Sequence, residues 1–260
     1  MEHAVADAPV LRTQDLTVAF GGHLAVNRVT CAFHRGTLTS IVGPNGAGKT
    51  TYLNLISGQL RATSGTVWLD GNALGGATAA RRAHLGIGRA FQLTSLFPNL
   101  TLLENVRLAV QSRRGGSLRL LSLAARRTDL VDRALDYLRQ VHLEQRAQQV
   151  AAALPHGDQR KLEVAILLAL EPTVFLFDEP TAGMSVDEVP VVLDLIHQIK
   201  RRGDKTILLV EHKMGVVRSL SDRIIVLHNG ALVADGAPDA VIASPIVQEA
   251  YLGMGGAARG

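Results

Sequence analysis

The stretch that decides the fold is Gly43-Pro44-Asn45-Gly46-Ala47-Gly48-Lys49-Thr50, which matches the pattern G-x-x-x-x-G-K-[ST] of phosphate-binding loops. The apolar run before it, residues 38–42, is typical of a buried parallel strand. After it, residues 51–56 carry apolar side chains at helical spacing. The sequence therefore predicts strand, loop and helix in the order that a phosphate site needs. The alternative is a glycine-rich turn that contains a lysine by chance.

Each part of this loop, taken from Gly43 to Thr51, has a chemical task. The glycines let main-chain N–H groups curl around phosphate oxygens, and the N-terminus of the following helix adds partial positive charge. We expect Lys49 to reach the β- and γ-phosphates of a nucleotide. We expect the hydroxyl of Thr50 to ligate magnesium.

A second apolar run, residues 174–177, leads directly into Asp178-Glu179-Pro180. Carboxylates are costly to bury unpaired, and open α/β sheets bind ligands at the carboxyl ends of their strands. We therefore expect Asp178 to hold magnesium through its water shell, and Glu179 to polarise an attacking water as general base. The alternative is that both carboxylates merely cap the next loop and helix.

With these residues in place, the chain resembles the nucleotide-binding subunit of an ATP-binding cassette (ABC) transporter over nearly its whole length. Six motifs occur in the order of that family, which is far more specific than any one of them. They are an aromatic residue (Phe20), the phosphate loop (Gly43 to Thr51), a glutamine after a strand (Phe91-Gln92), a signature segment (Leu154 to Lys161), an acidic strand end (Asp178-Glu179) and a final histidine (His212).

The resemblance implies a role for three further side chains. Phe20 would stack on adenine, and its alternative is a core phenylalanine. Gln92 would contact magnesium and the attacking water, and its alternative is a surface amide. His212 would bond the γ-phosphate and help to hold Glu179 and the water, and its alternative is a structural histidine.

The signature segment departs from the Leu-Ser-Gly-Gly-Gln that is usual in the family. Pro155 stands where the family has the serine that donates to the γ-phosphate bound by the partner subunit, although proline is tolerated at the first position of a helix. Asp158 is expected to bring negative charge close to that phosphate, while Gly157 can still present its amide. Ser185 stands where many relatives have aspartate. These departures leave a catalytically weak cassette as an alternative.

Several short stretches of the sequence are similar to those of the branched-chain amino acid importer ATPases, and similar stretches occur in urea and amide importers. This similarity is carried by five stretches: Phe20-Gly21-Gly22, residues 157–163, Ala182-Gly183-Met184, residues 210–214 and residues 250–253. The resemblance thus implies uptake of a small polar solute, most simply branched-chain amino acids.

The fold implied is an α/β P-loop NTPase with a RecA-like core sheet, an antiparallel β flank and an inserted α-helical subdomain. Residue patterns agree, because apolar runs bounded by turn residues predict strands and a 3.6-residue spacing predicts helices. We expect one domain over residues 1–260, with the core and β flank at about 8–95 and 171–253, the helical subdomain at about 96–170, and a flexible tail at 254–260. The expected elements are strands within 10–33 around Gly21-Gly22, at 65–71, 206–210 and 224–227, a hairpin turn at Asn229-Gly230, and an amphipathic helix at 186–199.

Composition agrees with a globular protein, and the resemblance implies a location at the cytoplasmic face of a bacterial inner membrane. Of the 260 residues, 47% are hydrophobic and 19% are charged. No run reaches the ~18 apolar residues of a membrane helix, and residues 1–8 lack the basic, apolar leader of a secretory signal.

The resemblance implies ATP and Mg²⁺ as cofactors, and protein partners rather than nucleic acid. The partners are a second ABC ATPase subunit, identical or different, two polytopic permease subunits and, indirectly, a periplasmic solute-binding protein. The net charge of +4 is modest, and aromatic residues at 4% are too few for a base-stacking surface.

Two other classes remain as alternatives. Soluble ABC proteins of DNA repair or translation usually carry a long coiled-coil insertion or two cassettes in one chain, and neither is visible. An ordinary P-loop kinase or GTPase would leave the signature segment and His212 without a role.

Overall fold

The computed structural model describes residues 8–90, 96–113, 123–245 and 247–248. The chain divides into two compact units, and each is considered by itself. Unit 1 comprises Met1–Ile87, Thr173–Glu179 and Lys200–Gly260, and unit 2 comprises Gly88–Pro172 and Pro180–Ile199.

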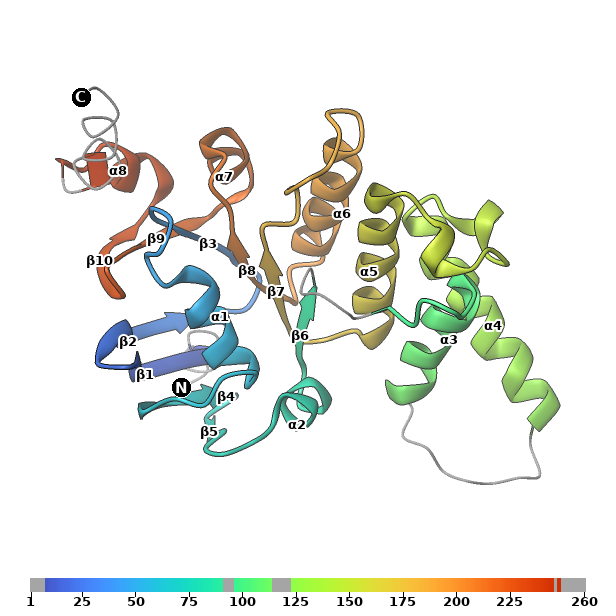
Figure 1. The fold of residues 1–260 in the computed structure, drawn as a ribbon, viewed down its shortest axis with the longest axis horizontal. Coiled ribbons are helices and arrows are strands. Elements are labelled where there is room, and N and C mark those ends of the chain that lie inside the picture. The colour runs from blue at the N-terminus through green and yellow to red at the C-terminus, as the bar shows by residue number, and fades with distance from the viewer. Residues whose placement is uncertain (1–7, 91–95, 114–122, 246, 249–260) are drawn as a thin grey trace, which may run out of the picture. The chain divides into compact units, whose positions relative to one another are not determined.

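An antiparallel sheet forms one part of unit 1, as the sequence predicts (Figure 1). Its first two strands pair through the Gly21-Gly22 turn, where both glycines have positive φ, at 53° and 86°. The strand order is β2-β1-β4-β5, with β1 at Leu11–Phe20, β2 at His23–Phe33, β4 at Ser64–Leu69 and β5 at Asn72–Ala73.

The second sheet is mostly parallel and carries the predicted core strands. β3 pairs in parallel with both β8 and β9, β7 pairs in parallel with β8, and β9 and β10 form the antiparallel hairpin expected at Asn229-Gly230. Since β3, β7 and β8 run the same way, their carboxyl ends meet at one edge of the sheet. The order is β10-β9-β3-β8-β7-β6, with β3 at Leu38–Val42, β6 at Ile87–Ala90, β7 at Val174–Asp178, β8 at Thr206–Val210, β9 at Arg223–His228 and β10 at Ala231–Gly236.

The core of unit 1 packs around α1, the helix that follows the phosphate loop. Tyr52 and Leu53 on this helix are fully buried, and so is Phe33 at the end of β2. The hydroxyl of Tyr52 lies 2.7 Å from the Thr13 hydroxyl of β1, so a buried hydrogen bond ties α1 to the antiparallel sheet. The helices of unit 1 are α1 at Lys49–Ser57, α2 at Ala79–His84, α7 at Met214–Leu220 and α8 at Pro238–Ile242.

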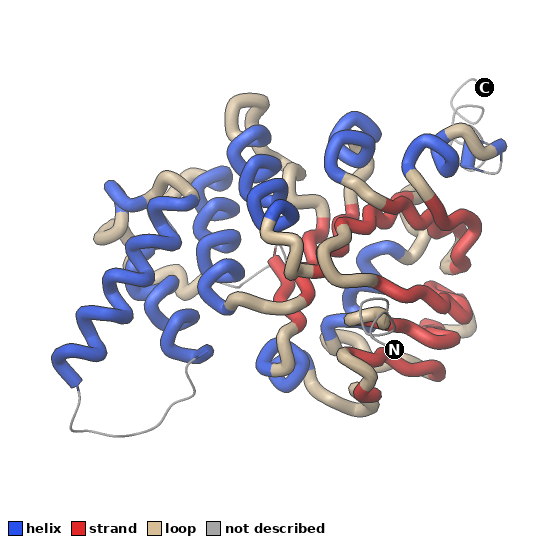
Figure 2. Tube along the Cα trace, turned by 180° about the vertical axis from the view of Figure 1, so that it is seen from behind, coloured by secondary structure: helices blue, strands red, loops and turns tan. Residues whose placement is uncertain are grey.

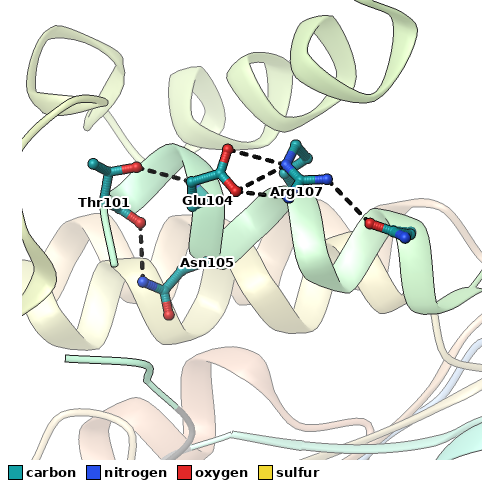
Figure 3. A network of polar contacts seen from close by, with 5 residues as sticks. Thr101, Glu104, Asn105 and Arg107 are labelled. Atoms are coloured by element: carbon teal, nitrogen blue, oxygen red, sulfur yellow. Dashed lines mark hydrogen bonds and ion pairs between the residues drawn. The ribbon is translucent and has the colours of Figure 1, made fainter. Parts of the chain in front are cut away.

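Unit 2 holds the helices expected between residues 100 and 170. α3, α4 and α5 pack against one another (Figure 2). α3 begins at Leu102 because Thr101 caps it, and the buried Asn105 donates to the carbonyl of Thr101 at 2.9 Å (Figure 3). Glu104 and Arg107 form an ion pair one turn along the same helix. The elements are α3 at Leu102–Arg113, α4 at Leu123–Gln140, α5 at His156–Leu170, and short turns at Glu144–Arg146 and Ala151–Ala153.

α6 spans Val189–Arg201, starting three residues later than the expected 186–199. Residues 186–188 form a turn before the helix, and the carboxylate of Glu188 accepts bonds from the N–H and hydroxyl of Ser185. The apolar face is the predicted one and is buried at Val192, Leu195, Ile196 and Ile199. None of the helices in the described part of the chain combines the length and hydrophobicity needed to cross a membrane.

Candidate functional site

The predicted phosphate loop joins β3 to α1, and its glycines are required by both conformation and space. Gly43, Gly46 and Gly48 have φ of 149°, 79° and 98°, a region that other residues rarely adopt. A Cβ on Gly43 would lie 2.1 Å from the carbonyl oxygen of Leu227, and one on Gly48 would lie 2.3 Å from that of Ala25. Gly46 has no atom within 4 Å on that side, so the loop faces open space there.

Lys49 opens α1, and its side chain turns back over the loop. Its Nζ donates to the carbonyl oxygens of Gly43 at 2.7 Å and Pro44 at 3.0 Å, and only 7% of the residue is exposed. Burial lowers the pKa of this ammonium, and the charges of Glu179 and Asp178 oppose that shift. The cation thus lies over the loop and beside the acidic strand end.

Thr50 and Asp178, the two expected magnesium ligands of unit 1, lie together. The Thr50 hydroxyl donates to Oδ1 of Asp178 at 3.2 Å. Magnesium takes oxygen ligands and is usually held by one or two protein groups together with waters and substrate phosphates, so this pair fits it. Within the described ranges, no group of three or more His, Cys, Asp or Glu side chains forms a self-sufficient metal site.

The loop and the expected general base line one depression of about 240 Å³. Glu179 contributes to it from the end of β7, where its N–H donates to the carbonyl of Val210 at 2.9 Å. Its φ of 50° is unusual for a glutamate, and such conformations cluster at functional sites. The lining consists of Ala25, Glu179 and the seven residues Asn45, Gly46, Ala47, Gly48, Lys49, Thr50 and Thr51.

Phe20 and His212 belong to unit 1 but do not line this depression. Phe20 is 50% exposed at the end of β1, which rules out the alternative of a core phenylalanine. The His212 side chain is 54% exposed just beyond β8. Gln92 lies outside the described residues, so its position after β6 stays a prediction.

Sequence reasoning missed two neighbours of the site. Ala25 of β2 lines the depression and touches Gly48 through its main-chain oxygen, a long-range approach that no local pattern reveals. Glu211 has a carboxylate with no exposed surface, and it accepts a hydrogen bond from the His212 N–H at 2.7 Å. The sequence does contain a signal for Glu211, because it is an acid that ends an apolar run and directly precedes a predicted site histidine.

The signature segment lies in unit 2 and differs from expectation in two respects. Pro155 occupies the N-cap position of α5 rather than its first turn, because its ψ of 155° is extended, and no side chain caps this end. Asp158 was expected to present negative charge, yet its carboxylate forms ion pairs with Arg146 and with Lys161, the latter at 2.8 Å. The expected repulsion of a phosphate is therefore offset by two cations.

Gly157 of the signature is fixed by a neighbour in the same unit. A Cβ at this position would lie 1.8 Å from Oε1 of Glu188, the residue whose carboxylate accepts a hydrogen bond from the Ser185 hydroxyl. The glycine therefore leaves room for the Glu188 carboxylate beside the start of α5.

The comparisons with known proteins agree with this geometry. Residues 26–182 match the family model described as ABC transporter, a span that includes the phosphate loop and Asp178-Glu179. Over 250 residues the chain is 37% identical to the high-affinity branched-chain amino acid transport ATP-binding protein LivG of Escherichia coli (strain K12), covering 94% of this chain and 98% of that protein. It is 38% identical over 251 residues to BraF of Pseudomonas aeruginosa, a protein described in the same words, with the same coverages.

Solved structures show the same fold. An ATP-binding cassette of an ABC transporter in its ADP conformation matches with a TM-score of 0.79 and 29% identity, over 94% of this chain and 98% of that chain. A nucleotide-free cassette of an ABC transporter matches with a TM-score of 0.79 and 28% identity, over 93% and 98% of the two chains.

Proposed function

Because this chain belongs to the ABC transporter family, we propose that it is the ATPase subunit of an importer for branched-chain amino acids. Cassettes of this family bind nucleotide and hydrolyse ATP to drive transport. The observation that carries the proposed solute class is the identity to LivG of Escherichia coli, at 37% over almost the full length of both proteins.

The proposed catalytic roles follow from the residues of unit 1. Main-chain N–H groups of the loop bind the phosphates, and the Lys49 ammonium offsets the charge on the β- and γ-phosphates. Glu179 accepts a proton from water while the water oxygen bonds to the γ-phosphorus. The bond to the β,γ-bridging oxygen breaks at the same centre, and ADP leaves with that electron pair.

Four further side chains orient the substrate in this proposal. Phe20 stacks on adenine, His212 bonds the γ-phosphate, and Thr50 with Asp178 holds Mg²⁺. The metal supplies neutralisation of charge on the β- and γ-oxygens. The contact of Gln92 with the metal and the attacking water is implied by the family resemblance alone, because Gln92 lies outside the described residues. The half-exposure of Phe20 and His212 supports their assignment, because a side chain that meets a ligand must be reachable.

Transport requires partners that this chain does not contain. We assign it a second cassette, two polytopic permease subunits and a periplasmic solute-binding protein, with the complex at the cytoplasmic face of the inner membrane. ATP contacts made only between two closed cassettes shift them towards association, and hydrolysis reverses the shift. In that closed state the amide of Gly157 faces the nucleotide of the partner cassette.

The solute class is tested by deleting the gene in the organism that encodes this chain and measuring uptake of radiolabelled leucine, isoleucine, valine, urea and acetamide. We expect uptake of the three amino acids to fall and to return with the wild-type gene but not with Lys49→Ala. The second candidate is a urea or amide importer, and it is favoured if urea or acetamide uptake falls while leucine uptake stays at the wild-type rate.

A further inference from the structure

Glu211 is a buried acid that the proposed mechanism does not use. It follows the buried strand β8 at the edge where β7 delivers Asp178 and Glu179, all within unit 1. Its side chain has no exposed surface, whereas that of the next residue, His212, is 54% exposed. Burying a carboxylate is unfavourable unless hydrogen bonds compensate, so the contacts of this group show what it holds.

The carboxylate of Glu211 accepts hydrogen bonds from the main chain of the two residues that follow it. Oε2 accepts the N–H of His212 at 2.7 Å and the N–H of Lys213 at 3.1 Å. The same oxygen lies 3.7 Å from Nδ1 of the His212 ring. A single carboxylate oxygen therefore fixes the main chain from which the imidazole projects and also faces one edge of that ring.

We propose that Glu211 is a positioning residue for His212 in ATP hydrolysis. The two main-chain bonds set where the histidine leaves the backbone, and the carboxylate favours the ring form that carries a proton on Nδ1. The Nε2 edge then faces away from Glu211 and is available to the γ-phosphate. This inference rests on the role proposed for His212.

A purely structural reading is that Glu211 caps α7, whose N-cap residue Lys213 makes no side-chain cap of its own. Glu211→Gln separates the two readings, because an amide oxygen still accepts both main-chain N–H bonds while the charge beside the ring is lost. Asp222→Asn is the matched control. Asp222 also accepts a main-chain N–H, that of Leu38 at 2.8 Å, but at the amino end of β3.

The first readout is the nitrogen NMR spectrum of histidine-labelled, nucleotide-free full-length protein, with the His212 signals assigned from their loss in His212→Ala. We expect Nδ1–H signals in the wild type and in Asp222→Asn, and a shift towards the Nε2–H form in Glu211→Gln. Identical His212 signals in wild type and Glu211→Gln overturn the proposal. This readout does not depend on hydrolysis, so it stands even if His212→Ala hydrolyses ATP normally and the role given to His212 is wrong.

The second readout is a double-mutant cycle on steady-state hydrolysis. We expect Glu211→Gln to lower kcat about 10-fold with less than about a two-fold change in KM, because it disturbs orientation rather than binding. In a His212→Ala background the same substitution should cost nothing further, since Glu211 acts through the ring. Equal losses in both backgrounds would show that Glu211 has only a structural role.

Discussion

The hydroxyl of Thr50 donates a 3.2 Å hydrogen bond to Oδ1 of Asp178, which joins residues 128 positions apart in the chain. Thr50 comes from the start of α1 and Asp178 from the end of β7, the two motifs that first suggested nucleotide chemistry. The bond brings together the two side chains that we propose hold magnesium. It therefore ties the phosphate loop to the acidic strand end within a single unit.

Lys49→Ala should weaken ATP binding by about 100-fold or more, because the ammonium that offsets phosphate charge is lost. Isothermal titration calorimetry with MgATP measures this directly. Lys205→Ala is the control, since Lys205 is also a little-exposed lysine of unit 1 but pairs with Asp204 beside β8. Equal affinities of wild type and Lys49→Ala for MgATP would show that this loop does not bind the phosphates of ATP.

Phe20→Ala should weaken ATP binding by about 1 to 2 kcal/mol, the loss expected for one stacking face, while single-turnover hydrolysis at saturating ATP stays near the wild-type rate. Leu24→Ala is the control, because Leu24 is an exposed apolar side chain of the same hairpin, paired with Ala19. If the single-turnover rate falls while affinity stays level, Phe20 acts through packing and not through adenine.

Gly157→Ala should lower the thermal stability of the protein by an amount equivalent to about 0.5 to 1 kcal/mol, because the new Cβ would displace the flexible carboxylate end of Glu188 from its bonds to Ser185. Gly215→Ala in α7 is the matched control, since a Cβ there meets nothing within 4 Å and replaces a helical glycine. That change should be neutral or stabilising by up to about 1 kcal/mol. A Gly157→Ala protein as stable as wild type would show that Glu188 moves aside without cost.

Pro155→Ser should strengthen ATP-dependent self-association in a Glu179→Gln background, because it supplies both a cap for α5 and a hydroxyl near the γ-phosphate of a partner. Sedimentation with and without MgATP reports the change. Asp158→Gln should not add to it, and should instead lower stability, because it strips Arg146 and Lys161 of their common carboxylate. Self-association of Pro155→Ser no tighter than that of the background would show that the main chain around Gly157 is sufficient.

Local patterns predicted the elements that build the site. The apolar run at 206–210 coincides with β8, and Asn229-Gly230 forms the expected hairpin turn, with φ of 48° and 76°. Such elements follow from residues adjacent in sequence, which is why periodicity and turn chemistry identify them.

The partners of charged groups could not be predicted in the same way. Asp158 meets Arg146 of a short helical turn twelve residues earlier, and Gly157 lies beside Glu188, which precedes α6, so neither contact leaves a local pattern. The two cations that offset the charge of Asp158 were therefore not predicted. For Phe20, the sequence gives no measure of exposure, and the structure was needed to exclude a core position.

If this chain binds ATP through the Lys49 loop and activates water through Glu179, Glu179→Gln should separate binding from hydrolysis. ATP affinity is measured by calorimetry with MgATP, and turnover by phosphate release on the same preparations. We expect Glu179→Gln to bind ATP at least as tightly as wild type and to lose nearly all phosphate release, because the carboxylate acts on the water and not on the nucleotide. Phosphate release from Glu179→Gln at the wild-type rate would contradict this expectation and assign the general base to another group.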